Sequence, residues 1–408
     1  MRIYTTSAGI SVLSKIGKQL HPHLHLHLHP RVQVHTPHAD TFSIKTNTRW
    51  IYDKPNMYKQ LDKWKDNIPW IKPYYAVKSN PAPYLIQDIV SHPCKVGLDV
   101  ASLAEIELAD NYTHVANTIY TNPHIINHEF SKYNNKIASL NIKVVDSMCE
   151  LKKIAMLNHM PKILIRMNGR NTKGETNFDT KFGASEEETE ELLEYAKKAK
   201  IEVCGISFHI GSGGTYNRKE AYMNAYEKAL PYLNKITVEV LPEPTILNFG
   251  GGLLPDTDLE EVFGWTETLP YQMIAEPGRY ISEPSHHLLT QVIAKTRRGV
   301  YLDNGIYHEL NCYQRDHWKF PALTWEVTIP PEEPEEIMHK AEVESTHTTT
   351  LFGPTCDSGD TIKPVSLPTN MQAGDWILLP NMGAYTNAGK VDFNGIEGAS
   401  SYAPWHLS

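Results

Sequence analysis

The sequence has few cysteines, no excess of positive charge and no long apolar run. Its five cysteines are an odd number, lie far apart and form no CxxC pair, which is typical of a reducing compartment rather than of a disulfide framework. The net charge of −8 argues against the broad basic field that binds nucleic acid or anionic membranes. No apolar run of about 18 residues could span a bilayer. We therefore expect a soluble, cytoplasmic protein that acts on a small molecule.

The first 39 residues also lack acidic side chains. Their basic, Ser/Thr-containing composition suits an organelle transit peptide as well, so organelle targeting stays an alternative. Within them "HPHLHLHLHP" alternates two residue types, and an extended chain would place four histidines on one face: His23, His25, His27 and His29. No carboxylate or cysteine joins them, so a solvated segment or edge strand is favoured over a metal site. We expect residues 1–40 to be an N-terminal extension that is flexible or has a targeting role. We expect no metal site in the protein.

Short apolar runs alternate with helix-like stretches across residues 54–283. The runs are "PYYAVK", "KVGLDVA", "KILIRM", "VCGISFHI", "TILNFGGG" and "MIAEPGRY", and between two of them Ser185 precedes a glutamate-rich first turn and a lysine-rich last turn. Repeated β-then-α units with apolar strands indicate a parallel sheet. Their number predicts an α/β fold, a (β/α)8 TIM-like barrel over 54–283, with a doubly wound open sheet as the alternative.

The chain becomes β-rich after residue 284. Runs such as "VYLDNGIY", "ALTWEVTI" and "DWILLP" are separated by turns and by a Pro/Glu-rich loop at 330–336. The length of 408 residues is in keeping with two domains. We expect residues 41–53 and 284–408 to form a second domain, a β-sandwich or β-barrel.

Polar and glycine-rich positions follow the predicted barrel strands, where barrels carry their functional residues. The candidates are Lys78, Asp99, Arg166, His209, Ser212, Gly250, Gly251, Gly252, Glu276 and Arg279. The turns "HIGSGG" and "NFGGG" would present backbone N–H groups to a phosphate. A lysine at a strand end facing a phosphate site predicts a Schiff base with an aldehyde cofactor, pyridoxal 5'-phosphate (PLP). A structural Arg279–Asp99 ion pair is the competing interpretation for those two residues.

Eight motifs in one order carry a resemblance to a known family. They are "YYAVKSNP", "GLDVASLAEI", "SFHIGSGG", "NFGGG", "AEPGRY", "NCYQRDH", "GPTCDSGD" and "GAYTNAGKVDFNG". From about residue 42 to 402 the chain resembles the eukaryotic-type ornithine decarboxylases, PLP-dependent enzymes with the alanine-racemase-type barrel. The resemblance implies decarboxylation of L-ornithine to putrescine and CO2, a step of polyamine biosynthesis, with Lys78, His209, Glu276 and Cys356 as catalytic residues.

The resemblance also implies how the cofactor is held. Lys78 would bind its aldehyde, His209 would stack on the ring and Glu276 would face the ring nitrogen. Glu276 would keep that nitrogen protonated, so that the ring draws electrons from the α-carbon. The remaining cofactor-side residues would be Asp99, Glu105, Arg166, Ser212, Gly250, Gly251, Gly252, Gly278, Arg279 and Tyr385.

The second half of the implied site comes from the β-domain of a partner subunit in a homodimer. Cys356 would return a proton to the α-carbon, and Asp357 with Asp316 would bind the distal ammonium of the substrate. Tyr385 and Phe393 complete the implied substrate-binding set, although Phe393 also suits an ordinary core position. Lys181 would pair with Asp360 across the dimer interface.

Three departures from the family pattern leave the substrate open. Arg315 stands where a tyrosine is usual beside the clamp, Asn248 replaces the aspartate before the triple glycine, and "LDNG" at 302–305 reverses the common order. Lysine, arginine or diaminopimelate are therefore alternative substrates, although Asp357 after the loop cysteine favours a diamino acid over diaminopimelate. A non-catalytic regulator like the antizyme inhibitors is the alternative outside enzymes, and an antizyme-like protein is a candidate partner.

Overall fold

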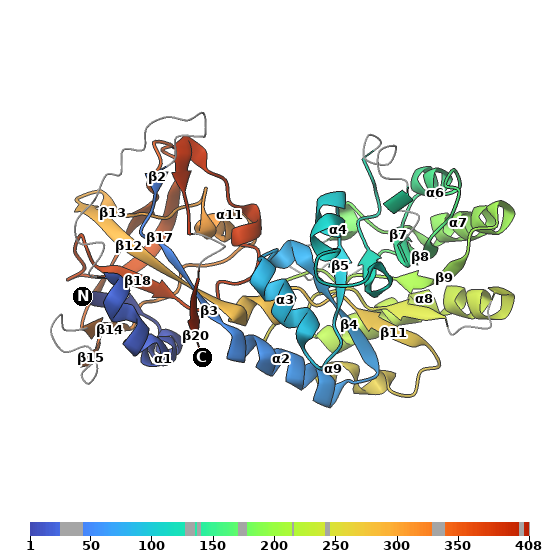
Figure 1. The fold of residues 1–408 in the computed structure, drawn as a ribbon, viewed down its shortest axis with the longest axis horizontal. Helices are drawn as coiled ribbons and strands as arrows, with labels where there is room; N and C mark the ends of the chain where they lie inside the picture. The colour runs from blue at the N-terminus through green and yellow to red at the C-terminus, as the bar shows by residue number, and fades with distance from the viewer. Residues whose placement is uncertain are drawn as a thin grey trace. The chain divides into compact units, whose positions relative to one another are not determined.

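A computed structural model describes residues 1–24, 44–126, 135–136, 140–169, 178–213, 216–240, 245–328, 339–399 and 404–407. The chain divides into two compact units (Figure 1). One unit is Tyr58–Ile281, and the other joins Met1–Met57 to Ser282–Ser408.

The first unit is a closed barrel of eight strands in the order β10-β11-β4-β5-β6-β7-β8-β9. Every neighbouring pair is parallel. The strands are β4 (Ile71–Ala76), β5 (Gly97–Val100), β6 (Thr118–Tyr120), β7 (Ile142–Val145), β8 (Lys162–Arg166), β9 (Val203–Ser207), β10 (Ile246–Asn248) and β11 (Gln272–Ala275). The predicted barrel is confirmed, and closure excludes the open sheet.

Apolar side chains fill the interior of this barrel. They are Tyr74, Ile119, Ile142, Val144, Leu164, Cys204, Ile246 and Ile274, all buried. The alternation along β7 shows the strand period, because Ile142 and Val144 face this core while the intervening Lys143 does not belong to it. The filled interior leaves the strand ends as the place for chemistry.

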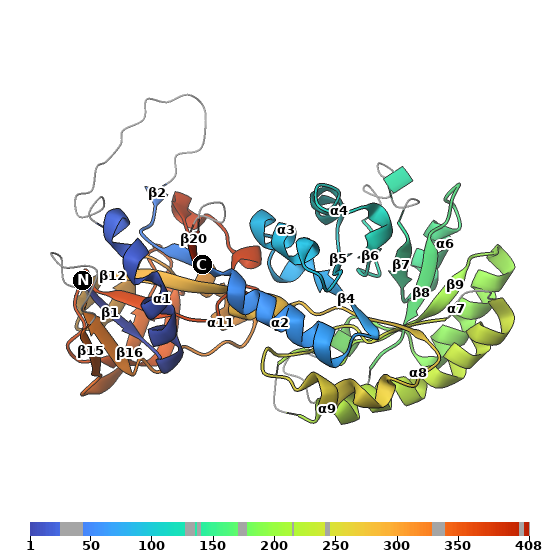
Figure 2. The same ribbon diagram turned by 60° about the horizontal axis from the view of Figure 1, so that its bottom comes forward.

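Helices surround the barrel, as α7 and α8 do outside the strands in Figures 1 and 2. The helices are α2 (Lys54–Asn67), α3 (Pro83–Ser91), α4 (Leu103–Ala109), α6 (Met148–Ile154), α7 (Glu186–Ala199), α8 (Arg218–Val240), α9 (Leu259–Phe263) and α10 (Arg279–Ser282). Helix α7 begins as the sequence predicts. The Ser185 side chain accepts from the Glu188 backbone, and the Glu188 carboxylate accepts from the Ser185 backbone, so two donors of the first turn are satisfied.

The second unit is built on a ten-stranded sheet. Its main path is β15-β14-β1-β18-β12-β13-β16-β17, and β3 pairs with both β12 and β20. The strands are β1 (Arg2–Thr5), β3 (Arg49–Asp53), β12 (His286–Thr296), β13 (Gly299–Leu302), β14 (Trp325–Thr328), β15 (His339–Glu342), β16 (Thr346–Phe352), β17 (Thr361–Pro368), β18 (Trp376–Leu379) and β20 (Trp405–Leu407). A separate pair joins β2 (Ile44–Lys45) to β19 (Ile396–Glu397).

Both faces of the large sheet are covered, because successive residues of its strands enter different cores. In β1, Ile3 belongs to one apolar cluster and Tyr4 to the other. The cluster of Ile3 includes Val12, Leu13 and Ile16 of helix α1 (Ser7–Leu24), so α1 packs on that face. The cluster on the other face includes Cys312, the first residue of the short helix α11 (Cys312–Arg315).

The N-terminal residues differ from the expected extension. Strand β1 pairs antiparallel with β14 and parallel with β18, so residues 2–5 are an internal strand of the sheet. Local patterns in the sequence do not indicate this pairing, because the strands that pair with β1 lie more than 300 residues further along the chain. Of the His/Leu segment, His25, His27 and His29 lie outside the described residues. In the part of the chain that is described, no helix has the length and apolarity to cross a bilayer.

Candidate functional site

The carboxyl ends of the barrel strands bring the main predicted residues to one rim. Asp99 is in β5 and Arg166 ends β8, while the others stand just after β4, β9 and β11: Lys78, His209 and Glu276. The Lys78 ammonium lies 3.9 Å from the buried Asp99 carboxylate. These five side chains are the rim cluster.

The turn that carries Lys78 is fixed by its neighbours. Strand β4 ends at Ala76, and Val77–Ser79 form a 3-10 turn. The Tyr75 hydroxyl donates to the Asn80 carbonyl at 2.9 Å, and the Asn80 side chain accepts from the Ala82 N–H at 3.1 Å. Ser79 and Asn80 are buried while the Lys78 side chain is 43% exposed. The motif therefore presents an accessible amine on a rigid turn.

Asp99 is held by a residue that the sequence did not single out. The Thr121 hydroxyl, just after β6, donates to Asp99 Oδ1 at 2.5 Å. Asp99 is 1% exposed, and burial raises its pKa although Lys78 acts in the opposite direction. Nearby Glu105 accepts from the Ala101 N–H at 2.6 Å, so its carboxylate also closes the start of α4. The signal for Thr121 was its place directly after an apolar strand.

His209 and the glycine run after β10 lie against each other. The ring Nδ1 of His209 accepts from the Gly211 N–H at 3.0 Å, which leaves the proton of a neutral ring on Nε2. A Cβ on Gly251 would stand 2.9 Å from that Nε2, and Gly250 and Gly252 have φ of +63° and +111°. The run therefore has to be glycine, both for its backbone and for room beside the imidazole.

The surroundings of His209 favour its neutral imidazole, and those of Glu276 favour a carboxyl that titrates near neutral pH. Burial, with the positive charges of Arg166 and Lys78, lowers the pKa of His209 well below its usual value. Burial and the charge of Asp99 raise the pKa of Glu276 to about 7. Perturbed groups gathered at one rim are typical of an active site.

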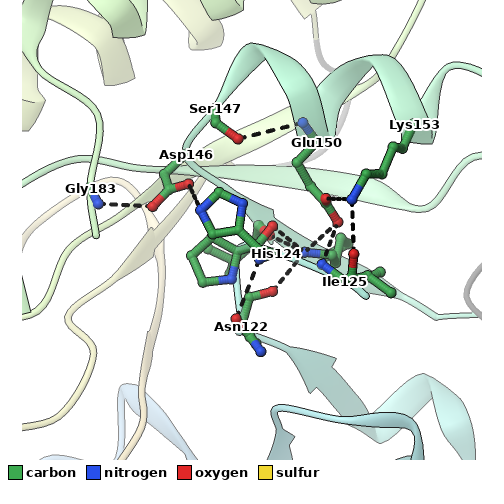
Figure 3. A network of polar contacts seen from close by, with 11 residues as sticks. Asn122, His124, Ile125, Asp146, Ser147, Glu150, Lys153 and Gly183 are labelled. Atoms are coloured by element: carbon green, nitrogen blue, oxygen red, sulfur yellow. Dashed lines mark hydrogen bonds and ion pairs between the residues drawn. The ribbon is translucent and has the colours of Figure 1, made fainter. Parts of the chain in front are cut away.

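Arg166 lies against Phe182, and the segment around Phe182 is hydrogen-bonded to Asp146, just after β7. Its guanidinium carbon is 4.9 Å from the Phe182 ring centre. The next residue, Gly183, donates its N–H to Asp146 Oδ2 at 2.9 Å, and Asp146 Oδ1 is 3.3 Å from His124 Nε2 (Figure 3). Asp146 thereby connects the segment around Phe182 to the loop that follows β6.

A buried lysine fixes that same loop. Lys143 is 0% exposed, and its ammonium donates to the carbonyls of Asn122, Pro123 and Val144 at 2.8, 3.1 and 2.6 Å. Its buried counter-charge Glu150 accepts from the Ile125 N–H, as Figure 3 shows. Burial lowers the pKa of Lys143 to about 8. This loop begins at Thr121, so the network supports the partner of Asp99.

The remaining cofactor-side candidates of the barrel stand at the same strand ends. Ser212 lies between two glycines of positive φ in the loop after β9. Gly278 and Arg279 follow β11, and Arg279 begins α10.

A second group of predicted residues gathers in the β-rich unit. Tyr307 donates its hydroxyl to Asp357 Oδ2, whose other oxygen accepts from the Gly359 N–H at 2.9 Å. The Tyr307 bond lowers the pKa of Asp357. Phe393 stacks on Tyr307, with ring centres 4.4 Å apart and planes at 15°. The exposed Cys356 donates its N–H to Asn394 Oδ1 at 3.0 Å. Sequence reasoning missed Tyr307, whose signal was only its place in "DNGIY".

Asp360 and Arg315 are engaged within their own unit. Asp360 is 2% exposed, and its oxygens accept from the Ile306 N–H at 2.9 Å and the Thr355 hydroxyl at 2.7 Å. Asp360 therefore shapes the loop of Cys356. Arg315 is exposed and donates to the Gly389 carbonyl at 3.2 Å.

The last two predicted residues of this unit stand at turns. Asp316 ends α11. Tyr385 has a φ of +56°.

Comparison with known proteins gives many relatives, among them two ornithine decarboxylases and an antizyme inhibitor. The chain is 31% identical over 378 residues to the ornithine decarboxylase, chloroplastic, of Nicotiana glutinosa, covering 85% of this chain and 81% of that protein. It is 30% identical over 370 residues to the antizyme inhibitor 2 of Xenopus laevis, covering 81% and 75%. It is 30% identical over 426 residues to the ornithine decarboxylase of Leishmania donovani, covering 85% of this chain and spanning 59% of that protein.

Solved structures agree on the fold. The arginine decarboxylase of Paramecium bursaria Chlorella virus bound to agmatine matches with a TM-score of 0.74 and 28% identity, covering 89% of this chain and 96% of that one. The lysine/ornithine decarboxylase of Vibrio vulnificus complexed with putrescine matches with a TM-score of 0.70 and 26% identity, covering 86% and 93%. Residues 55–283 match the family model of the pyridoxal-dependent decarboxylase, pyridoxal binding domain. The chain therefore belongs to the pyridoxal-dependent decarboxylases, whose cofactor is pyridoxal phosphate.

Proposed function

We propose that this protein decarboxylates L-ornithine to putrescine and CO2, acting as a cytoplasmic homodimer. The observation that carries the proposal is the rim cluster, in which an accessible lysine stands beside a buried aspartate at the mouth of a closed barrel. A lysine that is to bind the aldehyde of PLP covalently needs such an accessible amine.

The residues present fit the cofactor. Lys78 offers an exposed amine for its aldehyde, and the glycine run after β10, with φ of +63° at Gly250 and +111° at Gly252, has the kind of backbone that can turn N–H groups toward a phosphate. Among the described residues, Asp99 Oδ2 has no hydrogen-bond partner although it is buried, which suits an oxygen that receives one from a bound molecule. We propose Ser212, Gly250–Gly252, Gly278, Arg279 and Tyr385 as the phosphate set, and Asp99, Glu105 and Arg166 as its supporting network.

The chain's own residues divide the chemical work. When bound, PLP would supply a ring that accepts the electron pair left on the α-carbon by the loss of CO2. Glu276 holds a proton at the ring nitrogen, for which a pKa of about 7 suits it. His209, kept neutral, packs on the ring face without adding charge. Cys356 on its exposed loop supplies the proton to the α-carbon.

Recognition of a diamino acid rests on Asp357 and Asp316. The Asp357 carboxylate is held by the Tyr307 hydroxyl and the Gly359 N–H, and the Tyr307 bond lowers its pKa, so it is an oriented negative charge that can face a distal ammonium. Tyr307 and Phe393 stack beside it and would pack on the aliphatic part of the substrate. The bond from Arg315 to Gly389 gives that cation a partner of its own, which supports ornithine despite the departure from the family.

A single assay distinguishes the substrates. Purified protein with PLP is incubated with carboxyl-14C ornithine, lysine, arginine or diaminopimelate, and released CO2 is counted. We expect the highest kcat/KM with ornithine, and its loss in Asp316→Asn but not in the exposed control Glu344→Gln. The second candidate is a lysine or arginine decarboxylase, favoured by the solved neighbours. Ornithine kinetics unchanged in Asp316→Asn would favour it, and no CO2 from any substrate would refute the enzyme.

The homodimer and a regulatory role are tested separately. We propose that the Cys356 loop serves the partner's barrel and that Lys181 pairs with Asp360 across that interface. Mixing inactive Lys78→Ala with inactive Cys356→Ala should then restore about a quarter of the activity, through random exchange of subunits. No restored activity would refute shared sites. A visible absorption band from PLP bound to lysine would argue against an antizyme-inhibitor-like regulator, and pull-down with antizyme would test that partner.

A further inference from the structure

The side-chain amide of Asn248, the last residue of β10, links two parts of the rim. Asn248 is 0% exposed. Its Oδ1 accepts from the Gly250 N–H at 2.9 Å, and its Nδ2 donates to Glu276 Oε1 at 2.7 Å. A backbone N–H can only donate, so the oxygen of the amide has to face Gly250. The NH2 group then has to face Glu276, and the direction of both bonds is fixed.

Backbone contacts strengthen the same link. The Glu276 N–H donates to the Gly250 carbonyl at 2.7 Å. A Cβ on Gly251 would stand 3.0 Å from the Glu276 carbonyl and 2.9 Å from His209 Nε2. The glycine turn is therefore bonded to the backbone of Glu276 and packs closely against both Glu276 and His209.

We propose that Asn248 is a positioning residue that orients the Glu276 carboxylate and favours its ionised form, and that ties its charge to the conformation of the Gly250–Gly252 turn. The inference rests on the proposed function, in which Glu276 meets the ring nitrogen and the glycine turn meets the phosphate. Through the Asn248 amide, phosphate binding by the glycine turn would thus depend on the charge of Glu276 at the ring nitrogen.

The charges that face Glu276 come from three other elements. Asp99 of β5 repels it, while Lys78 after β4 and Arg166 of β8 attract it. Burial and Asp99 outweigh these attractions and the Asn248 bond, so the pKa of Glu276 is raised to about 7. The carboxyl is balanced between two states, and a change of one donor is enough to shift it.

The decisive variant is Asn248→Asp, which keeps the shape but replaces the donor with a second carboxylate. Two carboxylates at this distance cannot both ionise, so one would have to hold a proton. A carboxyl whose pKa is raised by folding destabilises the fold increasingly as pH rises from its unfolded pKa to its folded one. The Tm of the apo variant should match the wild type near pH 4 and fall on the order of 5 °C below it by pH 8.

The chain offers a matched control in Asn304. This buried amide also donates to a carboxylate, Glu309, and accepts from a backbone N–H, that of Leu310 at 3.2 Å. Because Glu309 also pairs with Lys390 at 3.2 Å, Asn304→Asp should lose less Tm than Asn248→Asp does. Asn304→Ala should leave PLP affinity within about twofold, whereas Asn248→Ala, which removes both bonds of the amide, should weaken it about tenfold or more. Equal changes in PLP affinity would overturn the link to the glycine turn.

A reversed pair separates positioning from simple packing. In Asn248→Asp with Glu276→Gln, the aspartate accepts from both Gly250 and the new amide, so the hydrogen bonds are restored with the charge moved. The apo Tm should return to within about 2 °C of the wild type at every pH. A deficit that is independent of pH, or that Glu276→Gln does not rescue, would overturn the inference.

Two further measurements keep the test decisive. If Asn248→Asp does not fold, Asn248→Ala removes the donor without adding charge, and its Tm deficit should still grow with pH unless Glu276→Gln is added. A deficit that is the same at every pH in this variant would again overturn the inference. If the wild type binds no PLP, the proposed function fails, whereas the apo Tm series still decides whether Asn248 sets the charge of Glu276.

Discussion

Removing the Thr121 hydroxyl tests how the rim cluster is held together. In Thr121→Val the shape is kept, but Asp99 Oδ1 loses its donor at 2.5 Å. Asp99 is 1% exposed, and its other oxygen has no hydrogen-bond partner among the described residues, so water does not readily replace the lost bond. Hydrogen bonds to charged groups contribute about 1.5–3 kcal/mol, and we expect a loss of that size in the free energy of unfolding at pH 7.5.

Urea denaturation of the apo protein, followed by tryptophan fluorescence, measures this loss. Thr189→Val is the matched control, because the Thr189 hydroxyl donates to the Ser185 carbonyl, which also accepts from the Thr189 N–H. The control should therefore lose less than about 1 kcal/mol. The Thr121→Val deficit should shrink as pH falls and Asp99 is protonated. Equal losses in both variants, or a deficit that does not change with pH, would refute the reasoning.

Three other predictions concern separate parts of the molecule. Ser185→Ala removes the cap of α7 and should lower the free energy of unfolding by about 1 kcal/mol in urea melts, with no effect on PLP affinity. Lys143→Met leaves three carbonyls without their donor and should lower it by about 2–3 kcal/mol, against no measurable change in exposed Lys198→Met. Tyr307→Phe removes the hydroxyl that orients the Asp357 carboxylate and should therefore reduce kcat/KM for diamino acids more than kcat; unchanged kinetics would exclude Tyr307 from recognition.

Much of the barrel could be predicted because its signals are local. Apolar runs that end in polar or glycine residues mark parallel strands and their carboxyl ends, and Lys78, Asp99, Arg166, His209 and Glu276 do stand at one rim. The strand period decides which side chains face the barrel interior, and closure of the sheet brings the carboxyl ends of the strands to one rim.

The parts that escaped prediction depend on distant pairings. Strand β1 pairs with residues 325–328 and 376–378, which no local pattern indicates. Likewise, nothing in the sequence shows that Thr121 donates to Asp99, or that Tyr307 donates to Asp357. The sequence shows that a side chain can form a hydrogen bond, but the fold determines which residue is its partner.

The attachment point of the cofactor is the most direct test. Protein loaded with PLP is reduced with borohydride, digested and mapped by mass spectrometry. We expect the pyridoxyl label on the peptide of Lys78, with no label in Lys78→Ala. Label on Lys143 or another lysine, or no label at all, would contradict the account.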